Sequence, residues 1–463
     1  MSNQKNQPAS TEPFPRSFWT ANVTELFERG AYYAMASFVV LYLGQLGLGD
    51  YWPSTLNGWL WGLVYFLPIL SGTIADQVGF KKSLLIAFIL LAAGYFLMGY
   101  PVWLGGQTMA ETVDSEVTAG AGVLVPVILA IILIGMGGSI IKPCISGTVQ
   151  KTAGAVGRAT LGFGIFYMII NIGSLFGRGI SFIVRKQLDL SFIFAVAIGC
   201  SALAFIAVLF LYTDPEDELD LKEKKKPKKS IGKILMNMIL VLKNVRFALF
   251  LVVSSGFFFL YAQVYNVLPL YLKKVVDVDP AVDIITMANP FVIVAFQLLI
   301  TKIFGKMKPI NSIIVGIVII GLSMAANIVP IFVAGGVRSV PFENWIPIGS
   351  VFVTLTVAMI AFGELFASAR SYEYIGALAP KGEEGLFLGY ASLPMAIGAI
   401  IGGPVGAFIF NEIMCKNSTK LDNGLLDLDP TWNMAGWLIL MSIGFASALS
   451  MWIYNRWLKA HPA

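Results

Sequence analysis

Three charged side chains stand inside a long apolar stretch near the start of the chain. Glu25, Glu28 and Arg29 are spaced i, i+3 and i+4, so a helix would place them on one face. The surrounding run, roughly 18–46, is otherwise apolar and long enough to cross a bilayer. One charge at mid-membrane costs about 2.5–3.5 kcal/mol on insertion scales, so these three must pair and must face a protein interior or a water-filled path. Such a group could lock a bundle as a structural ion pair, or it could exchange protons and hold a charged ligand.

Two further charged residues stand within other apolar stretches. Lys142 lies inside the stretch 121–150 and could complete the charge balance of the first group. Snorkelling at the end of a helix is the alternative for this lysine. Glu364 is the only acid in the middle of the stretch 346–376, and Arg370 is an alternative partner for it. The sequence therefore predicts opposite charges on separate helices of one membrane interior.

Aromatic and amide side chains accompany these charges. Tyr32, Tyr33 and Tyr65 could offer hydroxyl contacts to a ligand, although aromatic residues in membrane helices more often serve packing. Asn171 could bond either a ligand or a neighbouring helix. Arg178 is expected toward the outer end of its helix, without a partner that the sequence identifies, so a gate and snorkelling both stay open.

Composition places the whole chain in a membrane. Of its 463 residues, 57% are hydrophobic and 13% are charged, whereas a soluble protein has about 25% charged residues. The apolar runs are continuous rather than alternating, which disfavours an outer-membrane barrel. The first sixteen residues have no apolar core, so the first span is expected to direct insertion. The net charge of +5 indicates basic loops at a membrane surface, not nucleic-acid binding.

Few residue types are available for catalysis or metal binding. Cys144, Cys200 and Cys415 fit neither a metal site nor a disulfide framework, and His461 is the single histidine. A proton carrier inside the membrane must therefore be a carboxylate or a lysine. We expect no metal and no cofactor, and the absence of a nucleophile–base pair or phosphate loop disfavours a membrane enzyme or receptor.

The apolar stretches predict an all-α polytopic protein with about twelve transmembrane helices in two six-helix bundles. An N-terminal tail (1–16), a first bundle (17–212), a basic linker (213–243), a second bundle (244–456) and a C-terminal tail (457–463) follow from the pattern. The lysine run at 222–229 is expected to contact anionic lipid. Helices are predicted at 17–46, 54–75, 83–101, 121–150, 157–184, 190–212, 244–271, 283–304, 311–334, 346–376, 384–410 and 432–456.

Loop charges predict the orientation. Basic residues are concentrated in loops after even-numbered helices, so both termini and the linker are expected in the cytoplasm of a plasma membrane, such as a bacterial inner membrane. The loop after the third helix has acids but no basic residue. Asn417 begins an acceptor sequon in a loop that this orientation places outside, although such triplets often arise by chance.

One cytoplasmic loop has a recognisable pattern. It contains Gly72, Asp76, Gly79, Lys81 and Lys82, and it resembles the signature loop of the major facilitator superfamily. In a tight turn, the Asp76 carboxylate would contact a helix end and basic groups, and these contacts would hold the bundle in one conformational state. The resemblance implies that superfamily's fold and a role for these residues in conformational change, without naming a cargo.

Further motifs resemble the proton-dependent oligopeptide transporters of that superfamily. Glu-x-x-Glu-Arg followed by Tyr-Tyr is similar to this family's first-helix motif. Three more pieces agree in order along the chain: Lys142-Pro143, the stretch 166–173 around Asn171, and Gly363-Glu364-Leu365. Other positions depart from the family: Ala36 stands where an arginine is usual, Ala262-Gln263 replaces Glu-Gln, and a tryptophan is absent near Leu386-Phe387.

The resemblance implies a proton-coupled symporter that imports di- or tripeptides or peptide-like zwitterions by alternating access. Glu25, Glu28, Arg29 and Lys142 would handle the proton. The expected cargo contacts are Arg29, Tyr32, Tyr33, Tyr65, Lys142, Asn171 and Glu364, of which Glu364 would attract the amino terminus. The departures keep open a non-peptide organic anion or a nucleoside-like cargo on the same fold. We expect a monomer in the bilayer with the proton as coupling ion; which glutamate carries it stays open.

Overall fold

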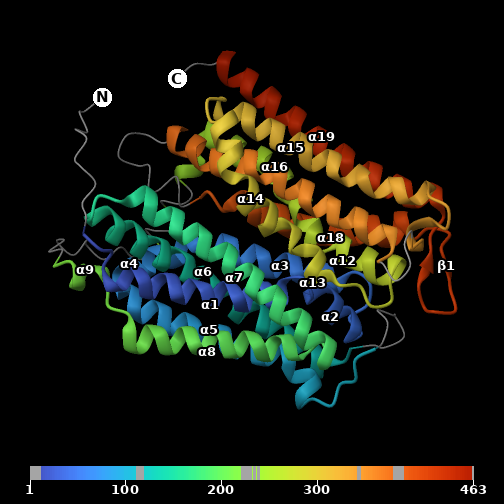
Figure 1. The fold of residues 1–463 in the computed structure, drawn as a ribbon, viewed down its shortest axis with the longest axis horizontal. Coiled ribbons are helices and arrows are strands. Elements are labelled where there is room, and N and C mark those ends of the chain that lie inside the picture. Colours follow the sequence, from blue (N-terminus) through green and yellow to red (C-terminus); the bar gives the residue numbers. More distant parts are fainter. Residues whose placement is uncertain are drawn as a thin grey trace.

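The computed structural model describes residues 12–460 except 111–118, 221–231, 233–235, 237–239, 341–345 and 379–389. Long helices that run nearly along one axis make up most of it (Figure 1). Helices α1–α8, blue to green, group together beside α14–α19, yellow to red. The first group, here the N-terminal half, consists of α1 (Arg16–Ala36), α2 (Val39–Gln45), α3 (Trp52–Phe66), α4 (Pro68–Val78), α5 (Phe80–Trp103), α6 (Ala121–Ala155), α7 (Ala159–Gln187) and α8 (Phe192–Leu211), with the short α9 (Pro215–Glu218) after it.

The C-terminal half has more interruptions. A small antiparallel hairpin, in which Thr419 pairs with Asp427, precedes its last helix. The elements are α11 (Val245–Tyr261), η1 (Ala262–Tyr265), α12 (Val267–Tyr271), η2 (Leu272–Val276), α13 (Val282–Thr286), α14 (Ala288–Phe304), α15 (Pro309–Ala325), η3 (Ala326–Phe332), η4 (Gly336–Arg338), α16 (Ile348–Leu378), α18 (Leu393–Phe408), η5 (Ile409–Met414), β1 (Thr419–Lys420), β2 (Leu426–Asp427) and α19 (Pro430–Ala460).

The helices are those of a membrane protein. Within the described chain, ten helical runs are long and apolar enough to cross a bilayer. The broken pairs α1–α2 and α3–α4 supply the two remaining spans of a twelve-helix arrangement. α1 is not among these ten runs because it carries the charged group at its centre. α3 and α4 are not among them because each is too short to cross a bilayer alone. The predicted fold class of twelve membrane helices is confirmed.

Several predicted helices are not continuous. The predicted helix 17–46 breaks at Ser37 and Phe38, where a tight turn bonds Phe38 N to Met35 O at 2.8 Å. The predicted helix 54–75 breaks at Leu67, because Pro68 has no N–H with which to continue the ladder. The predicted helix 244–271 passes into the 3₁₀ segment η1 at Ala262.

Other predicted boundaries were wrong in the second half and at helix ends. The first residues of the helix predicted at 384–410 lie outside the described residues; within them, residues 390–392 form a turn and α18 begins at Leu393. The helix predicted at 283–304 is split at Met287 into α13 and α14. The fourth and last helices continue beyond their predicted ends, to Ala155 and Ala460. Hydropathy locates the spans but does not show where the backbone turns inside them.

Small residues bring the site helices together. α1 packs against α7 and α8. A Cβ at Gly177 of α7 would lie 2.3 Å from Gly30 O of α1, so only glycine permits this approach. Between the halves, a Cβ at Gly403 of α18 would lie 2.2 Å from Ser54 O of α3. These contacts set α1 beside α7 and bring α3 to the boundary between the halves.

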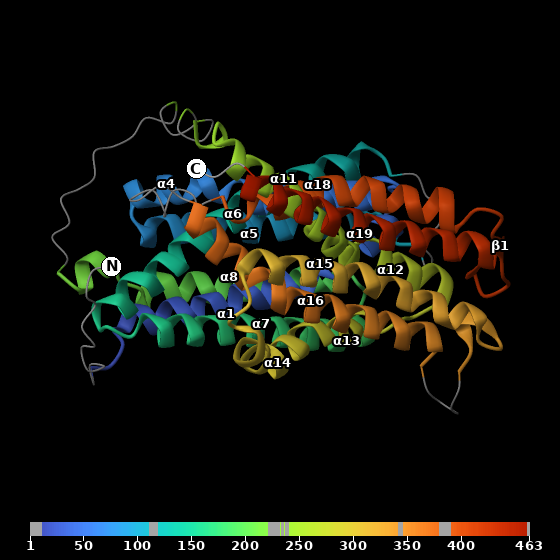
Figure 2. The same ribbon diagram turned by 90° about the horizontal axis from the view of Figure 1, so that it is seen from above.

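The two ends of the molecule differ. Both views place α9 and the start of α1 at one end and the β1–β2 hairpin at the other (Figures 1 and 2). We call these the α9 end and the β1 end. At the β1 end the halves are joined by polar contacts, including Lys274 to Asp50 at 2.8 Å and Asn57 to Asn266 at 3.1 Å. The structure therefore has its halves bonded together at the β1 end.

Candidate functional site

The charged residues of α1 form one buried network. Arg29 Nε lies 3.2 Å from Glu25 Oε1 and also pairs with Glu28 Oε2. All three side chains are buried, the two glutamates almost completely. Glu25 Oε2 has no hydrogen-bond partner among the residues that the structure describes. The i, i+3, i+4 spacing thus places two carboxylates on one guanidinium, as the sequence predicts.

An aromatic cluster continues from this network toward the other half. Tyr32 and Tyr33 meet edge to face with ring centroids 5.1 Å apart, and Tyr32 meets Trp61 of α3 at 5.3 Å. Trp61 in turn lies 5.7 Å from Tyr65 and 4.6 Å from Tyr265 of η1. We call these five residues the tyrosine cluster. It joins α1 and α3 to the C-terminal half, so the predicted Tyr32, Tyr33 and Tyr65 do lie together.

Lys142 and Glu364 come from different halves. Lys142 Nζ is 5.4 Å from the centre of the Tyr65 ring, and no carboxylate of the described chain lies within ion-pair distance of it. Glu364 accepts a hydrogen bond from Asn289 Nδ2 at 3.3 Å. Lys142 is within electrostatic range of both Glu364 and Glu25. The alternative in which Arg370 neutralises Glu364 does not occur here, because Arg370 pairs with Glu373 at 2.6 Å.

Two polar residues of α7 have different surroundings. Asn171 is buried and donates to the carbonyl of Tyr167, one turn earlier in its own helix, at 2.8 Å. Arg178 is 1% exposed, and its guanidinium lies 4.5 Å from the centre of the Tyr33 ring. It donates to Ser174 in its own helix, to Thr286 of α13 at 3.1 Å and to Tyr265 at 3.2 Å. Arg178 therefore does not snorkel; it bridges the two halves.

The signature loop is held by a residue outside it. Gly79 has φ of +97° and ends α4, and Asp214 Oδ1 accepts a hydrogen bond from Lys81 N at 2.8 Å at the start of α5. Gly72 lets α4 approach Pro143 of α6. The side chain of Asp76 lies outside the described part of the structure, so its predicted role is not addressed, and Lys82 points to the exposed surface.

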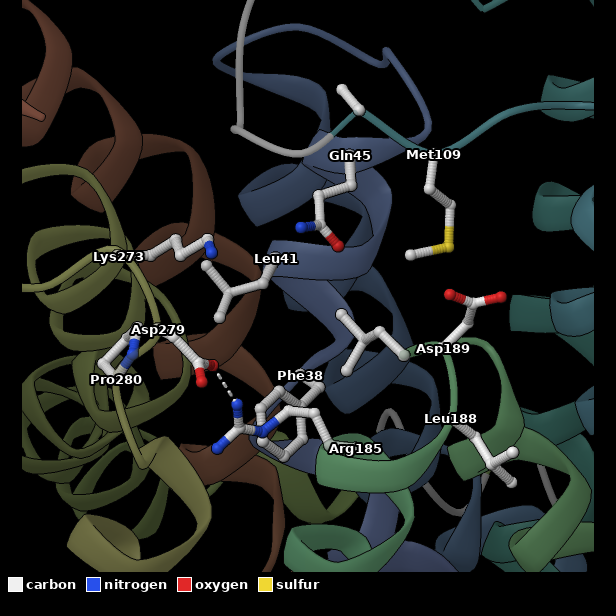
Figure 3. Close-up of a pocket in the computed structure, with 12 residues that line it drawn as sticks. Phe38, Leu41, Gln45, Met109, Arg185, Leu188, Asp189, Lys273, Asp279 and Pro280 are labelled. Atoms are coloured by element: carbon white, nitrogen blue, oxygen red, sulfur yellow. Dashed lines mark hydrogen bonds and ion pairs between the residues drawn. The ribbon is translucent and has the colours of Figure 1, made fainter. Parts of the chain in front are cut away.

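A polar pocket of about 270 Å³ opens between the halves toward the β1 end (Figure 3). Arg185 pairs there with Asp279 and lies 3.4 Å from Asp283, and Lys186 also pairs with Asp279. Partial burial opposes ionisation of Asp279, but hydrogen bonds and charges from Lys186 and Arg185 outweigh it and hold its pKa below the ordinary value. The figure shows Arg185 directed at Asp279 across the boundary.

Sequence reasoning missed several members of this arrangement. Trp61, Asn289 and Asp214 contact predicted site residues. Tyr265 and Thr286 contact Arg178, whose role the sequence left open. None stands in a motif that singles it out, and Thr286 and Tyr265 lie about a hundred residues from Arg178. Only a charge in an apolar stretch gave a signal, which is why Arg178 was noticed and its partners were not.

The chain belongs to the major facilitator superfamily. The family profile described as Major Facilitator Superfamily matches residues 31–360. The solved "peptide transporter POT in complex with sulfate" superposes with a TM-score of 0.71 at 18% identity, over 96% of this chain and 94% of that one. A "POT family transporter in complex with 5-aminolevulinic acid" gives 0.70 at 18% identity, over 95% and 96%. These likenesses confirm the superfamily's fold.

Curated relatives are similar over a smaller region. "Dipeptide and tripeptide permease A" of Klebsiella pneumoniae is 28% identical over 222 residues, which are 45% of this chain and 39% of the permease. "Solute carrier family 15 member 1" of Rattus norvegicus is 32% identical over 179 residues, 38% of this chain and 25% of the carrier. The chain thus spans well under half the length of these relatives. They are transporters, not enzymes, and the resemblance to the proton-dependent oligopeptide transporters is confirmed.

Proposed function

We propose that this chain is a proton-coupled symporter that imports di- or tripeptides, or peptide-like zwitterions, by alternating access. The observation that carries the proposal is the buried network of Glu25, Glu28 and Arg29 inside an apolar bundle. The names of the relatives, which are dipeptide and tripeptide permeases, support the cargo. Two membrane bundles that can rock about a site between them supply the movement.

Charge counting gives the coupling step. When all are ionised, two glutamates balance Arg29 and Lys142. Protonation of one glutamate therefore leaves one excess positive charge, which the carboxylate of a cargo would balance. Arg29 is available for this because its terminal amino groups have no hydrogen-bond partner within the described chain. Loss of the proton on the cytoplasmic side would restore the internal pairing and release the carboxylate.

We propose Glu25 as the glutamate that takes the proton. Glu28 makes the closer contact with Arg29, whereas Glu25 retains one buried oxygen, Oε2, without a partner among the described residues. A buried carboxylate oxygen with no donor favours the protonated form of the group. The coupling ion is then the proton alone, with no metal or cofactor.

The cargo site extends across the halves. Arg29 and Lys142 would face the carboxylate, and Glu364 of α16 would face the amino terminus. Tyr32, Tyr33 and Tyr65 offer polarisable walls that tolerate varied side chains, and Asn171 is a further candidate contact. A zwitterion of peptide length suits opposite charges held apart in this way.

A non-peptide zwitterion or organic anion is the second candidate. Ala36 and Ala262 differ from the peptide-transporter pattern, and a similar fold has been solved with 5-aminolevulinic acid, a small amino acid. A nucleoside-like cargo rests on the same departures. The charge geometry requires a carboxylate or similar anion but sets no minimum number of peptide bonds.

The decisive experiment is uptake into sealed proteoliposomes under an inward proton gradient, with a mixed peptide pool outside and mass spectrometry of what accumulates. Peptide accumulation that collapses with a protonophore supports the main proposal. A non-peptide taken from cell extract, with peptides excluded, selects the second candidate. If no solute accumulates under any imposed pH difference, the carrier proposal is wrong.

We further propose that both termini, and hence the α9 end, face the cytoplasm of the plasma membrane. The basic linker then meets anionic lipid on that side, and the β1 end faces outward. A monomer contains all the proposed site residues. Cysteines introduced near Lys459 and near Lys420, labelled with a membrane-impermeant maleimide in intact cells, test this: only the latter should react.

A further inference from the structure

Unlike the other arginines near the site, Arg178 has no carboxylate partner among the described residues. Arg29 pairs with two glutamates, and Arg185 pairs with Asp279 and Asp283. No carboxylate of the described chain lies within ion-pair distance of Arg178, although its side chain is 1% exposed. A buried charge without a counter-charge is unfavourable, and hydroxyl groups compensate it only partly. This guanidinium therefore remains a favourable place for an anion.

The hydroxyl partners of Arg178 come from both halves. Ser174 is one turn earlier on α7 and moves with Arg178. Thr286 and Tyr265 belong to α13 and η1 of the C-terminal half. Ser37, in the turn before α2, also lies 3.1 Å from the Thr286 hydroxyl, so two residues of the N-terminal half, Ser37 and Arg178, contact this threonine. Any separation of the halves at the β1 end must remove two of the three hydroxyls from Arg178.

That separation would leave a free guanidinium beside the tyrosine cluster. Its position over the ring of Tyr33 is fixed within the N-terminal half, because α1 and α7 touch through glycines and do not depend on the other half. Arginine binds a carboxylate through two parallel hydrogen bonds, which a hydroxyl cannot match. Closure would then return the hydroxyls of Thr286 and Tyr265 to the arginine.

We propose that Arg178 binds the carboxylate of the incoming cargo while the β1 end is open, and exchanges it for Thr286 and Tyr265 as that end closes. The inference rests on the proposed function and adds a binding residue to it. The tyrosine cluster connects Tyr33, the ring beside Arg178, to Tyr65, the ring beside Lys142. A carboxylate released from Arg178 at closure could therefore pass to Lys142.

The test compares two versions of one transported peptide, the free acid and its C-terminal amide, in proteoliposomes under a fixed inward proton gradient. Wild type should have a lower KM for the acid. Arg178→Gln should raise the KM of the acid by about tenfold or more, since a charged hydrogen bond contributes about 1.5–3 kcal/mol, and should leave that of the amide unchanged. Arg178→Lys keeps the charge but not the bidentate fork, so its KM for the acid should rise several-fold.

Thr286→Val is the matched control. It removes a hydroxyl from the opposite half but leaves the guanidinium, so the preference for the acid should persist even if the turnover rate changes. The inference is wrong if wild type does not distinguish acid from amide, if Arg178→Gln keeps the preference, or if it impairs both peptides equally, as a mere latch would.

Two outcomes separate this inference from the proposed function. If Arg178→Gln does not fold, the lysine variant decides: a selective rise for the acid supports the inference, and an equal change for both peptides contradicts it. If wild type transports no peptide at all, the proposed function has failed first, whereas peptide transport without acid selectivity at Arg178 overturns only the present inference.

Discussion

Two buried arginines of the N-terminal half illustrate two ways of keeping a charge inside a membrane protein. Arg29 and Arg178 both lie over tyrosine rings, at 5.0 Å from Tyr32 and 4.5 Å from Tyr33. Arg29 has its two carboxylates on its own helix, so its neutralisation is independent of how the halves are placed. Arg178 has only hydroxyls, two of them from the opposite half. The first arrangement does not depend on contacts with the opposite half, whereas the second loses two of its hydroxyls if the halves separate.

The largest expected effect comes from breaking the Arg29 network on its acidic side. Glu28→Gln should abolish uptake driven by a pH gradient, because it leaves Glu25 as the only counter-charge of Arg29 and so opposes its protonation. Exchange of cargo between the two sides should remain, because exchange needs the site but not net proton movement. Uptake of labelled peptide under a gradient, and counterflow without one, measure the two activities. Unchanged gradient-driven uptake would contradict a coupling role for this network.

Glu25→Gln should have the same effect if Glu25 takes the proton, and it should also remove the pH dependence of exchange. Asn22→Ala, one turn earlier on α1, is a matched control, since Asn22 Nδ2 donates to Phe18 O in its own helix. If exchange by the Glu25→Gln protein still varied with pH, Glu28 and not Glu25 would be the glutamate that takes the proton.

The next effect concerns stability. Arg29→Met leaves two buried carboxylates without their cation and should cost about 3–5 kcal/mol, seen as a large fall in Tm in detergent. Adding Glu25→Gln and Glu28→Gln to the same protein should restore most of that loss. If the triple variant is no more stable than Arg29→Met alone, the loss reflects packing and not unpaired charge.

Arg178→Met should lower the stability of the protein less than Arg29→Met does. The substitution removes a charge that has no acid, and the Thr286 hydroxyl can still donate to Val282 O at 2.8 Å. We expect a loss of about 1 kcal/mol, because the lost hydrogen bonds are offset by relief of an unpaired buried charge. A fall in Tm as large as that of Arg29→Met would mean that the two arginines are equally structural.

The smallest effect is expected in the polar pocket toward the β1 end, where Asp279 is partly exposed. Asp279→Asn should lower stability by at most about 1 kcal/mol near neutral pH, since its carboxylate is half in solvent. The lowered pKa of Asp279 means that its contribution is complete above the ordinary aspartate value of about 3.9 and disappears as pH falls through the lower folded value. Tm of both proteins between pH 3 and pH 7 checks this; a difference that instead grew with acidity would refute the assigned ion pair.

The sequence alone determined the features that depend on local spacing. Glu25, Glu28 and Arg29 meet because a helix brings i, i+3 and i+4 together whatever surrounds it. Apolar length likewise fixed the membrane class, and a charge inside such a stretch marked Lys142, Arg178 and Glu364 as unusual. Each of these inferences uses information that lies within about 20 neighbouring residues.

The tertiary structure decided which distant groups compensate those charges. Thr286 and Tyr265 beside Arg178, Asn289 beside Glu364 and Asp214 at the start of α5 are ordinary polar residues in the sequence. Their contacts follow from how closely glycine-lined helices approach and from where the predicted long helices break. Hydropathy averages over such details, because every face of a membrane helix can be apolar, and only packing selects the face that meets a charge.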